Sequence, residues 1–349
     1  MLATKKRKYL FFISQDYSFP VLRPLQKAIE LRGDTVKWFL YGNEIDYAHL
    51  DSTEIRLYSI EDIIAFKPNV VFVPGNVVPS FIPGLKVEVF HGLPSEKRKK
   101  TGELYHYTIR GMFDLYCTQG PSSTKVFQRL SKKYKTFSVQ ETGWSKLDPL
   151  FHTKTKDFTD KTIFFASTFS PRFSKAKELY PFILHMIKTY AFKWNITLHP
   201  KMDKETVSKF KSIDSPKVQF IESVDIIESF KESDIMLCDT SSIIYEFLTQ
   251  SKPVITYQTA TEHSSLINVT DIGELEKTIL ETLAHPNKNT KSIQDYVKEF
   301  HPYTDGQSSQ RVLDAVDVIL GGKNIASRKK PLNLIRNFKL RRELNYWKF

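Results

Sequence analysis

Two histidines, His91 and His199, each follow a short apolar run in the sequence. An imidazole titrates near neutral pH, so either side chain could accept a proton or hold an anion. Gly92 follows the first histidine and permits close approach to the backbone, whereas Pro200 and Lys201 follow the second. Each histidine is therefore expected at the carboxyl end of a strand, which is where open α/β sheets bind their ligands. A purely structural role for each histidine is the alternative.

The turn Asp239-Thr240-Ser241-Ser242 could bind phosphate. It lies between a predicted strand, 235–238, and a predicted helix, 243–250, and the first backbone N–H groups of a helix form an anion site. The hydroxyl groups of Ser241 and Ser242 would add donors. The carboxylate of Asp239 repels phosphate, so we expect it to cap the helix or orient the serines. A helix cap without any ligand is the alternative.

Strands and helices must position these residues, and their patterns alternate along the chain. Continuous apolar runs are typical of strands whose sheet is covered on both faces. Segments with helical spacing, such as 19–32 and 174–190, separate these runs. Strand–helix alternation predicts an α/β fold with doubly wound parallel sheets. The predicted strands are 9–14, 35–41, 70–74, 86–90, 114–119, 136–141, 162–166, 195–198, 218–222, 235–238 and 254–257.

The length of 349 residues suits two domains. A polar, turn-rich stretch around residues 152–161 separates the two series of strands. We therefore predict a first Rossmann-like domain at 1–152, a second Rossmann-like domain at 153–322 and a basic amphipathic tail at 323–349. The two domains are expected to face a common cleft that brings His91 and His199 to one substrate.

Composition limits the classes of function. The net charge is +12, but residues 328–349 contain eight basic residues and one acidic residue, so the body of the protein is only mildly basic. Nucleic acid is therefore not an expected partner. The two cysteines suit a reducing cytosol, and the sequence contains no P-loop, G-x-G-x-x-G, HExxH or D-x-D motif. We expect neither a metal nor a cofactor.

Five blocks in the sequence together resemble the CDP-glycerol glycerophosphotransferase family, the teichoic-acid-type polymerases and primases. They are VFHG, GWSKLD, LHP, DTSS with the following EF and KPVITY, and DGQSSQR. The resemblance implies a GT-B-like pair of Rossmann-like domains, an acceptor-side domain at 1–152 and a nucleotide-donor domain at 153–322. It also implies an essential base at His91 and donor-binding roles for Arg172, Glu246, Asp305 and Gly306. Gly92, Gly143, Lys146 and Lys201 would border the cleft and face phosphate.

The function that this resemblance implies is transfer of glycerol phosphate. A hydroxyl of a glycan or lipid-linked glycan acceptor would attack CDP-glycerol, or a related CDP-polyol, and release CMP. His91 would take the proton, while His199, Ser241 and Ser242 would hold the pyrophosphate. Such an enzyme would serve cell-envelope polysaccharide biosynthesis in the cytoplasm or peripherally at the inner face of the membrane.

Alternatives on the same fold remain open, because a fold does not determine its chemistry. One is a nucleotide-sugar glycosyltransferase or a non-hydrolysing sugar-nucleotide 2-epimerase. Another is a non-catalytic protein that binds a membrane or nucleic acid. The tail at 328–349 could lie on an anionic membrane surface or pack on the first domain as a closing helix.

Overall fold

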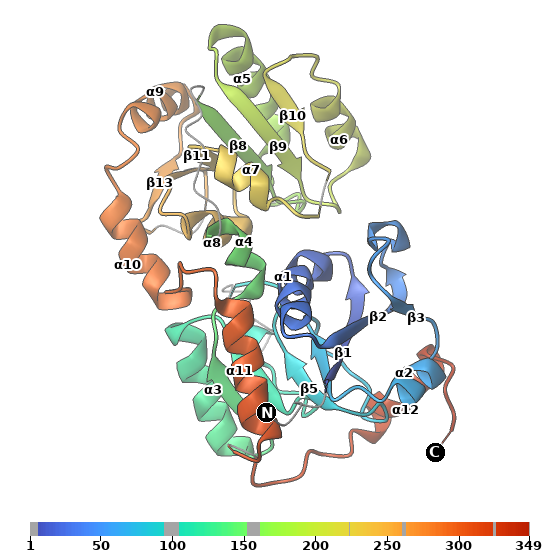
Figure 1. The fold of residues 1–349 in the computed structure, drawn as a ribbon. Helices are drawn as coiled ribbons and strands as arrows, with labels where there is room; N and C mark the ends of the chain where they lie inside the picture. The colour runs from blue at the N-terminus through green and yellow to red at the C-terminus, as the bar shows by residue number, and fades with distance from the viewer. Residues whose placement is uncertain are drawn as a thin grey trace. The chain divides into compact units, whose positions relative to one another are not determined.

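The computed structural model describes residues 6–93, 105–151, 161–222, 224–259, 263–323 and 326–348 (Figure 1). The chain forms two compact units. The first comprises residues 1–151 and 300–349, and the second comprises residues 152–299. Each unit is an α/β structure around a parallel sheet, which confirms the predicted fold class of two Rossmann-like domains.

The first unit contains a seven-stranded sheet in the order β3-β2-β1-β4-β5-β6-β7. The chain builds outward from β1 to β3, then returns to the other side of β1 for β4, so the order reverses between β1 and β4. The strands are β1 (Lys8–Gln15), β2 (Thr35–Glu44), β3 (Arg56–Leu57), β4 (Val70–Val73), β5 (Leu85–Glu88), β6 (Leu115–Thr118) and β7 (Ser138–Glu141). The helices are α1 (Ser18–Leu31), α2 (Ile60–Phe66), α3 (Pro121–Tyr134), α4 (Asp148–Phe151), α11 (Ser308–Leu320) and α12 (Leu334–Glu343).

The second unit contains a six-stranded sheet in the order β10-β9-β8-β11-β12-β13, and its order reverses between β8 and β11. The strands are β8 (Thr162–Ser167), β9 (Lys193–Leu198), β10 (Val218–Phe220), β11 (Ile235–Cys238), β12 (Val254–Tyr257) and β13 (Leu266–Val269). The helices are α5 (Ala176–Thr189), α6 (Lys204–Lys211), α7 (Ile227–Glu232), α8 (Ile243–Leu248), α9 (Ile272–Ala284) and α10 (Thr290–Phe300).

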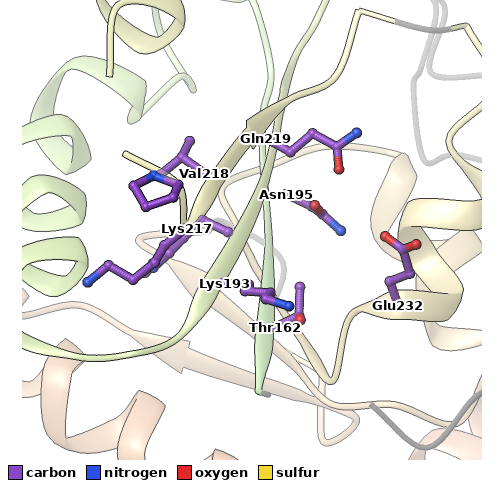
Figure 2. A pocket seen from close by; sticks show the side chains of 9 residues that line it. Thr162, Lys193, Asn195, Lys217, Val218, Gln219 and Glu232 are labelled. Atoms are coloured by element: carbon purple, nitrogen blue, oxygen red, sulfur yellow. The ribbon is translucent and has the colours of Figure 1, made fainter. Parts of the chain in front are cut away.

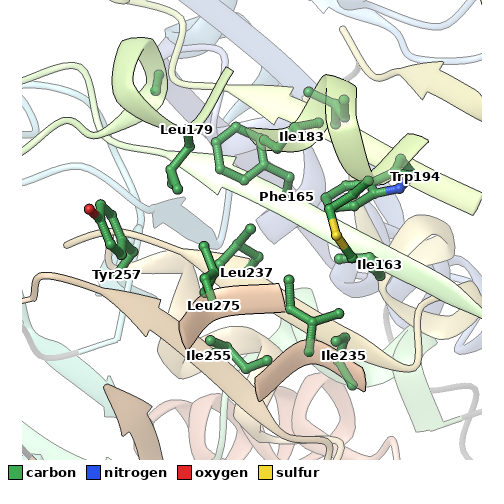
Figure 3. Close-up of a cluster of buried hydrophobic side chains, with 14 of the residues drawn as sticks. Ile163, Phe165, Leu179, Ile183, Trp194, Ile235, Leu237, Ile255, Tyr257 and Leu275 are labelled. Atoms are coloured by element: carbon green, nitrogen blue, oxygen red, sulfur yellow. The ribbon is translucent and has the colours of Figure 1, made fainter. Parts of the chain in front are cut away.

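The core of the second unit explains why its strands are apolar throughout. Alternate residues of β8, such as Ile163 and Phe165, pack beneath α5 together with Leu237 of β11 (Figure 3). The intervening Phe164 points to the other face, where its ring contacts Phe230 and Phe247 of α7 and α8. Because both faces are covered, every position of β8 and β11 is buried.

The predicted boundary at residue 322 is wrong. Helix α11 belongs to the first unit, so the chain returns to that unit at residue 300 and not after residue 322. The reason is that Asp148 at the start of α4 accepts hydrogen bonds from the backbone nitrogens of Ser308 (2.8 Å) and Ser309 (2.7 Å) at the start of α11. A pattern of local periodicity contains no information about such a distant partner.

The described part of the tail packs on the first unit. Lys330 forms an ion pair with Asp114 at 2.6 Å, and the Asn333 side chain donates to the carbonyl oxygens of Arg110 and Gly111, each at 3.0 Å. Further along, the Tyr346 ring stacks on Phe81 with 5.4 Å between centroids. Among the described residues, no helix is long and apolar enough to cross a membrane.

Candidate functional site

Asp239, directly after β11, connects the loops that follow β8 and β11. Its carboxylate is 1% exposed. It accepts hydrogen bonds from the Ser167 hydroxyl, from the backbone nitrogen of Thr168 at 2.9 Å and from that of Lys175 at 3.0 Å. Burial raises the pKa of Asp239, and these hydrogen bonds oppose that rise. The order of the sheet reverses between these two strands, which is where open α/β sheets bind ligands.

The predicted role of Asp239 is corrected by these contacts. Instead of the predicted cap on α8, its carboxylate accepts hydrogen bonds from the Ser167 hydroxyl and from the backbone of Thr168 and Lys175. Helix α8 is a six-residue helix, shorter than predicted, and the Ser242 side chain at its start makes no capping hydrogen bond. Ser242 is exposed and Ser241 is half-buried at the carboxyl edge of β11.

The 168–175 loop contains Arg172. The Arg172 side chain is exposed, and its guanidinium group lies over the ring of Phe173 at 5.4 Å from the centroid. Asp239 therefore fixes both ends of the loop that presents this cation.

His199 lies at the carboxyl end of β9, next to β8. Its backbone nitrogen donates to the carbonyl oxygen of Ser167 at 3.3 Å, and its ring lies 4.3 Å from that of Phe169. Nδ1 of His199 is 3.0 Å from the backbone nitrogen of Lys201, which can only donate. The neutral ring therefore has its hydrogen on Nε2, so Nε2 is a hydrogen-bond donor.

Glu246 and Lys252 follow the Asp239–Ser242 turn in the sequence, and Lys252 lies just before β12, at the amino edge of the sheet. Glu246 is 8% exposed on α8. The Lys252 ammonium group donates to the carbonyl oxygens of Phe230, Lys231 and Ser233, at 3.0, 2.9 and 2.7 Å. Burial lowers the pKa of Lys252 to about 8. Lys252 thus stabilises the end of α7, so the lysine of the Lys252-Pro253 pair has a structural role.

His91 in the first unit follows β5 and contacts the loops after both strands at which that sheet reverses. Nδ1 of His91 is 3.1 Å from the carbonyl oxygen of Pro74, just after β4. The His91 ring lies 5.0 Å from that of Tyr17, just after β1. Because a carbonyl oxygen only accepts, Nδ1 carries the hydrogen and Nε2 of the neutral ring is the proton acceptor.

Buried groups support the turn that contains His91. The side chain of Gln119, after β6, is fully buried and donates to the carbonyl oxygen of Gly92 at 2.8 Å. The indole nitrogen of Trp144 donates to the carbonyl oxygen of Phe90 at 3.1 Å. The His106 ring stacks on Phe90, and burial, aided by the nearby His91, lowers the pKa of His106 to about 4.

The G-W-S-K-L-D block, residues 143–148, packs against the start of α11. Gly143 has a φ of +79°, and a Cβ at this position would lie 2.4 Å from Oγ of Ser308. Lys146 is 9% exposed, and its ammonium group lies over the Trp144 ring at 5.2 Å from the centroid. Asp148 holds the start of α11. These contacts give Gly143 and Lys146 a packing role, and their contact with phosphate stays a prediction.

Asp305 and Gly306 form the turn that leads into α11. Asp305 accepts from the backbone nitrogen of Gln307 at 3.0 Å and pairs with Arg311. Gly306 has a φ of +66°, a conformation that favours glycine. Asp305 thus closes the turn before α11, whose N-cap residue, Gln307, makes no side-chain capping hydrogen bond.

A pocket of about 230 Å³ lies at the opposite, amino edge of the second sheet (Figure 2). Residues from the beginnings of β8, β9 and β10 line it, among them Thr162, Lys193 and Gln219. Lys201, in contrast, is exposed beside His199 at the carboxyl edge. Among the residues that the structure describes, no group of three or more His, Cys, Asp or Glu side chains could hold a metal ion.

Sequence reasoning missed Ser167, Tyr17 and Gln119. Each lies at the last position of a strand or one to two residues after it. The carboxyl end of a predicted strand was therefore the sequence feature that could have indicated them. No periodicity identifies their partners, which are up to 74 positions away in the chain.

Comparison with known proteins identifies a different family from the predicted one. The sequence profile described as UDP-N-acetylglucosamine 2-epimerase matches residues 108–317. No curated protein sequence matches the chain.

Solved structures show the same fold. A UDP-N-acetylglucosamine 2-epimerase structure from Listeria monocytogenes has a TM-score of 0.61 at 15% identity, covering 94% of this chain and all of that one. The S. aureus MnaA structure with UDP has a TM-score of 0.61 at 14% identity, covering 93% and 100%. The wall teichoic acid polymerase TagF has a TM-score of 0.66 at 13% identity, covering 91% and 90%.

The prediction of a CDP-glycerol glycerophosphotransferase is therefore wrong, as are the teichoic-acid role and the CDP-glycerol donor that followed from it. Most of the blocks behind that prediction are turns at the carboxyl ends of parallel strands. The TagF structure and the epimerase structures both resemble this fold, so such turns do not separate the two groups.

Proposed function

The chain belongs to the UDP-N-acetylglucosamine 2-epimerase family, and we propose on this basis that it interconverts a UDP-N-acetylhexosamine and its C2 epimer. The observation that carries the proposal is that backbone contacts hold the two strand-end histidines in opposite tautomers. His91 presents an acceptor nitrogen and His199 presents a donor N–H.

Inversion at C2 requires a base that removes the C2 proton and an acid that returns a proton on the other face. The carbon next to C2 carries the diphosphate. As the base takes the C2 proton, the electron pair of the C2–H bond forms a C1=C2 double bond and the C1–O bond breaks; UDP then adds back to C1 as a proton returns to C2. Donors to the diphosphate therefore act together with the base. Substrate and product are isomers, so the reaction consumes neither an acceptor nor a redox cofactor.

The second unit supplies the groups that suit the diphosphate. Nε2–H of His199, the hydroxyl groups of Ser241 and Ser242 and the Arg172 guanidinium are all donors at or near one sheet edge. Asp239 fixes the loop that contains Arg172. Nε2 of His91 in the first unit is the base for the C2 proton. A cytoplasmic or peripheral location of the enzyme stays a prediction.

The test is incubation of the full chain with UDP-N-acetylglucosamine in D₂O, followed by proton NMR. We expect loss of the C2 proton signal and appearance of the manno epimer. His91→Gln should slow this exchange about 10²–10⁴-fold at saturating substrate. His199→Gln should mainly weaken UDP binding, measured by calorimetry.

His185→Gln is the matched control, because His185 is an exposed histidine of α5 that pairs with Glu276. Its exchange rate should equal that of the wild type. Wild-type exchange in the His91→Gln protein would exclude His91 as the base. An absence of both UDP binding and exchange in the unmodified chain would exclude the proposed reaction.

A further inference from the structure

The tail exposes several large apolar side chains that lie close together in the sequence. Leu332, Leu334 and Ile335 are 71–76% exposed, Phe338 is 56% exposed and Trp347 is 44% exposed. The Phe338 and Trp347 rings lie 5.4 Å apart, which joins helix α12 to the residues after it. We call these five residues the tail surface. Apolar groups gathered in this way on a protein surface mark an interaction site.

Helix α12 does not need the tail surface to pack on the first unit. Its inward face contains Asn333, Asn337, Leu340 and Leu344, which follow helical spacing. Asn337 accepts from the backbone nitrogen of Ser80 at 3.2 Å, and Leu340 is 4% exposed. The helix is therefore held through a stripe of two asparagines and two leucines, and Leu334, Ile335 and Phe338 are left exposed.

Basic side chains surround the tail surface. Helical spacing places Lys339 and Arg342 on the same outward face as Ile335 and Phe338. Among the described residues, neither Lys339 nor Arg342 forms an ion pair. Lys329 and Arg336 are also exposed, so the rim of this apolar area is strongly positive.

We propose that the tail surface docks the enzyme on an anionic lipid bilayer. Apolar and aromatic side chains with adjacent lysine and arginine match the interface of such a bilayer, where the rings enter the headgroup region and the cations meet lipid phosphates. A protein partner of neutral or basic character would leave the cations uncompensated. Three of its five residues, Leu334, Ile335 and Phe338, lie on the packed helix α12, so docking requires no folding of that helix. The proposal is independent of the reaction that the enzyme catalyses.

Trp347 provides a specific probe of docking. The protein has four tryptophans, and the other three, Trp38, Trp144 and Trp194, are at most 1% exposed. We expect vesicles of phosphatidylcholine with phosphatidylglycerol to shift the Trp347 emission to shorter wavelength. Vesicles of phosphatidylcholine alone should have a much smaller effect, and added salt should reverse the shift. Sedimentation with the vesicles should likewise show stronger binding to the anionic vesicles than to phosphatidylcholine alone, and weaker binding with added salt.

Two variants remove the two components of the surface. Phe338→Ser reduces its apolar area, and the double variant Lys339→Glu/Arg342→Glu reverses its charge. Each should weaken vesicle binding about tenfold or more. The matched controls are Leu31→Ser, which changes a leucine 81% exposed at the end of α1, and Lys132→Glu/Lys133→Glu on α3. Both controls should bind as the wild type does.

Circular dichroism of each variant verifies that it folds. An unchanged Trp347 emission with anionic vesicles would overturn the proposal, and so would equal binding to neutral vesicles. Light scattering tests the remaining occupant, a second copy of the chain. Self-association that Phe338→Ser abolishes, without vesicle binding by the wild type, would show a protein contact and exclude the membrane.

Discussion

The carboxylate of Asp239 accepts a hydrogen bond from the backbone nitrogen of Thr168 at 2.9 Å, although 71 positions separate the two residues. This bond joins the loops after β8 and β11, the two strands at which the second sheet reverses its order. The same carboxylate holds Ser167 and Lys175. A single buried acid thus determines the shape of the edge to which we assign the diphosphate.

Asp239→Asn tests this assignment. The amide places a donor against backbone donors, so we expect a loss of about 1–3 kcal/mol in the free energy of unfolding. We also expect UDP binding to weaken, because the 168–175 loop that contains Arg172 loses its support. Urea unfolding and titration calorimetry measure the two effects.

Asp234→Asn is the control for Asp239→Asn. Asp234 accepts from the backbone nitrogen of Thr162 at 2.8 Å, at the amino edge of the same sheet. Asp234→Asn should lower the free energy of unfolding and leave the affinity for UDP unchanged. Equal effects of the two variants on UDP affinity would contradict a special role for the Asp239 edge.

Gly143→Ala tests the packing contact between the G-W-S-K-L-D block and the start of α11. Gly143 has a left-handed backbone conformation, which is strained for alanine. In addition, the new Cβ would lie 2.4 Å from Oγ of Ser308. We expect destabilisation of about 2–5 kcal/mol, the sum of backbone strain and overpacking. Thermal and urea unfolding measure it.

Gly33→Ala separates the two contributions to the Gly143→Ala effect. Gly33 has a φ of +75°, but no atom lies within 4 Å of its hypothetical Cβ. This variant should therefore show the backbone strain alone, about 1–2 kcal/mol. If both alanine variants lose the same stability, the contact with Ser308 is unimportant.

His301 predicts a pH dependence of stability. Nε2 of His301 accepts a hydrogen bond from the backbone nitrogen of Trp144 at 3.1 Å, and burial lowers the pKa of His301 from 6.5 to about 4. Between these values the unfolded chain binds a proton that the folded protein excludes. The free energy of unfolding should therefore fall as the pH drops from 6.5 towards about 4, by up to about 1.4 kcal/mol per pH unit.

His301→Gln should reduce this slope, because the glutamine oxygen can accept the Trp144 hydrogen bond without titrating. The comparison requires urea unfolding of both proteins across the same pH range. His106, whose pKa burial also lowers to about 4, should maintain part of the slope in the variant. An unchanged slope would show that His301 is not a source of the acid sensitivity.

The sequence alone determined the alternation of strands and helices and the position of His91 and His199 after apolar runs. These features depend on local periodicity and local turn chemistry, which a linear pattern records. The same local features misidentified the family, because turns at strand ends reflect a fold that proteins of different activity share.

Only the tertiary structure decided what these residues contact. The order of the strands brings Pro74 to His91 and Ser167 to Asp239, and those contacts set the tautomer of one ring and the role of the buried acid. It also turned Asn337 and Leu340 of α12 inward and left Phe338 exposed. The physical reason is that hydrogen bonds and burial act between residues close in space, and their separations along the chain follow no period.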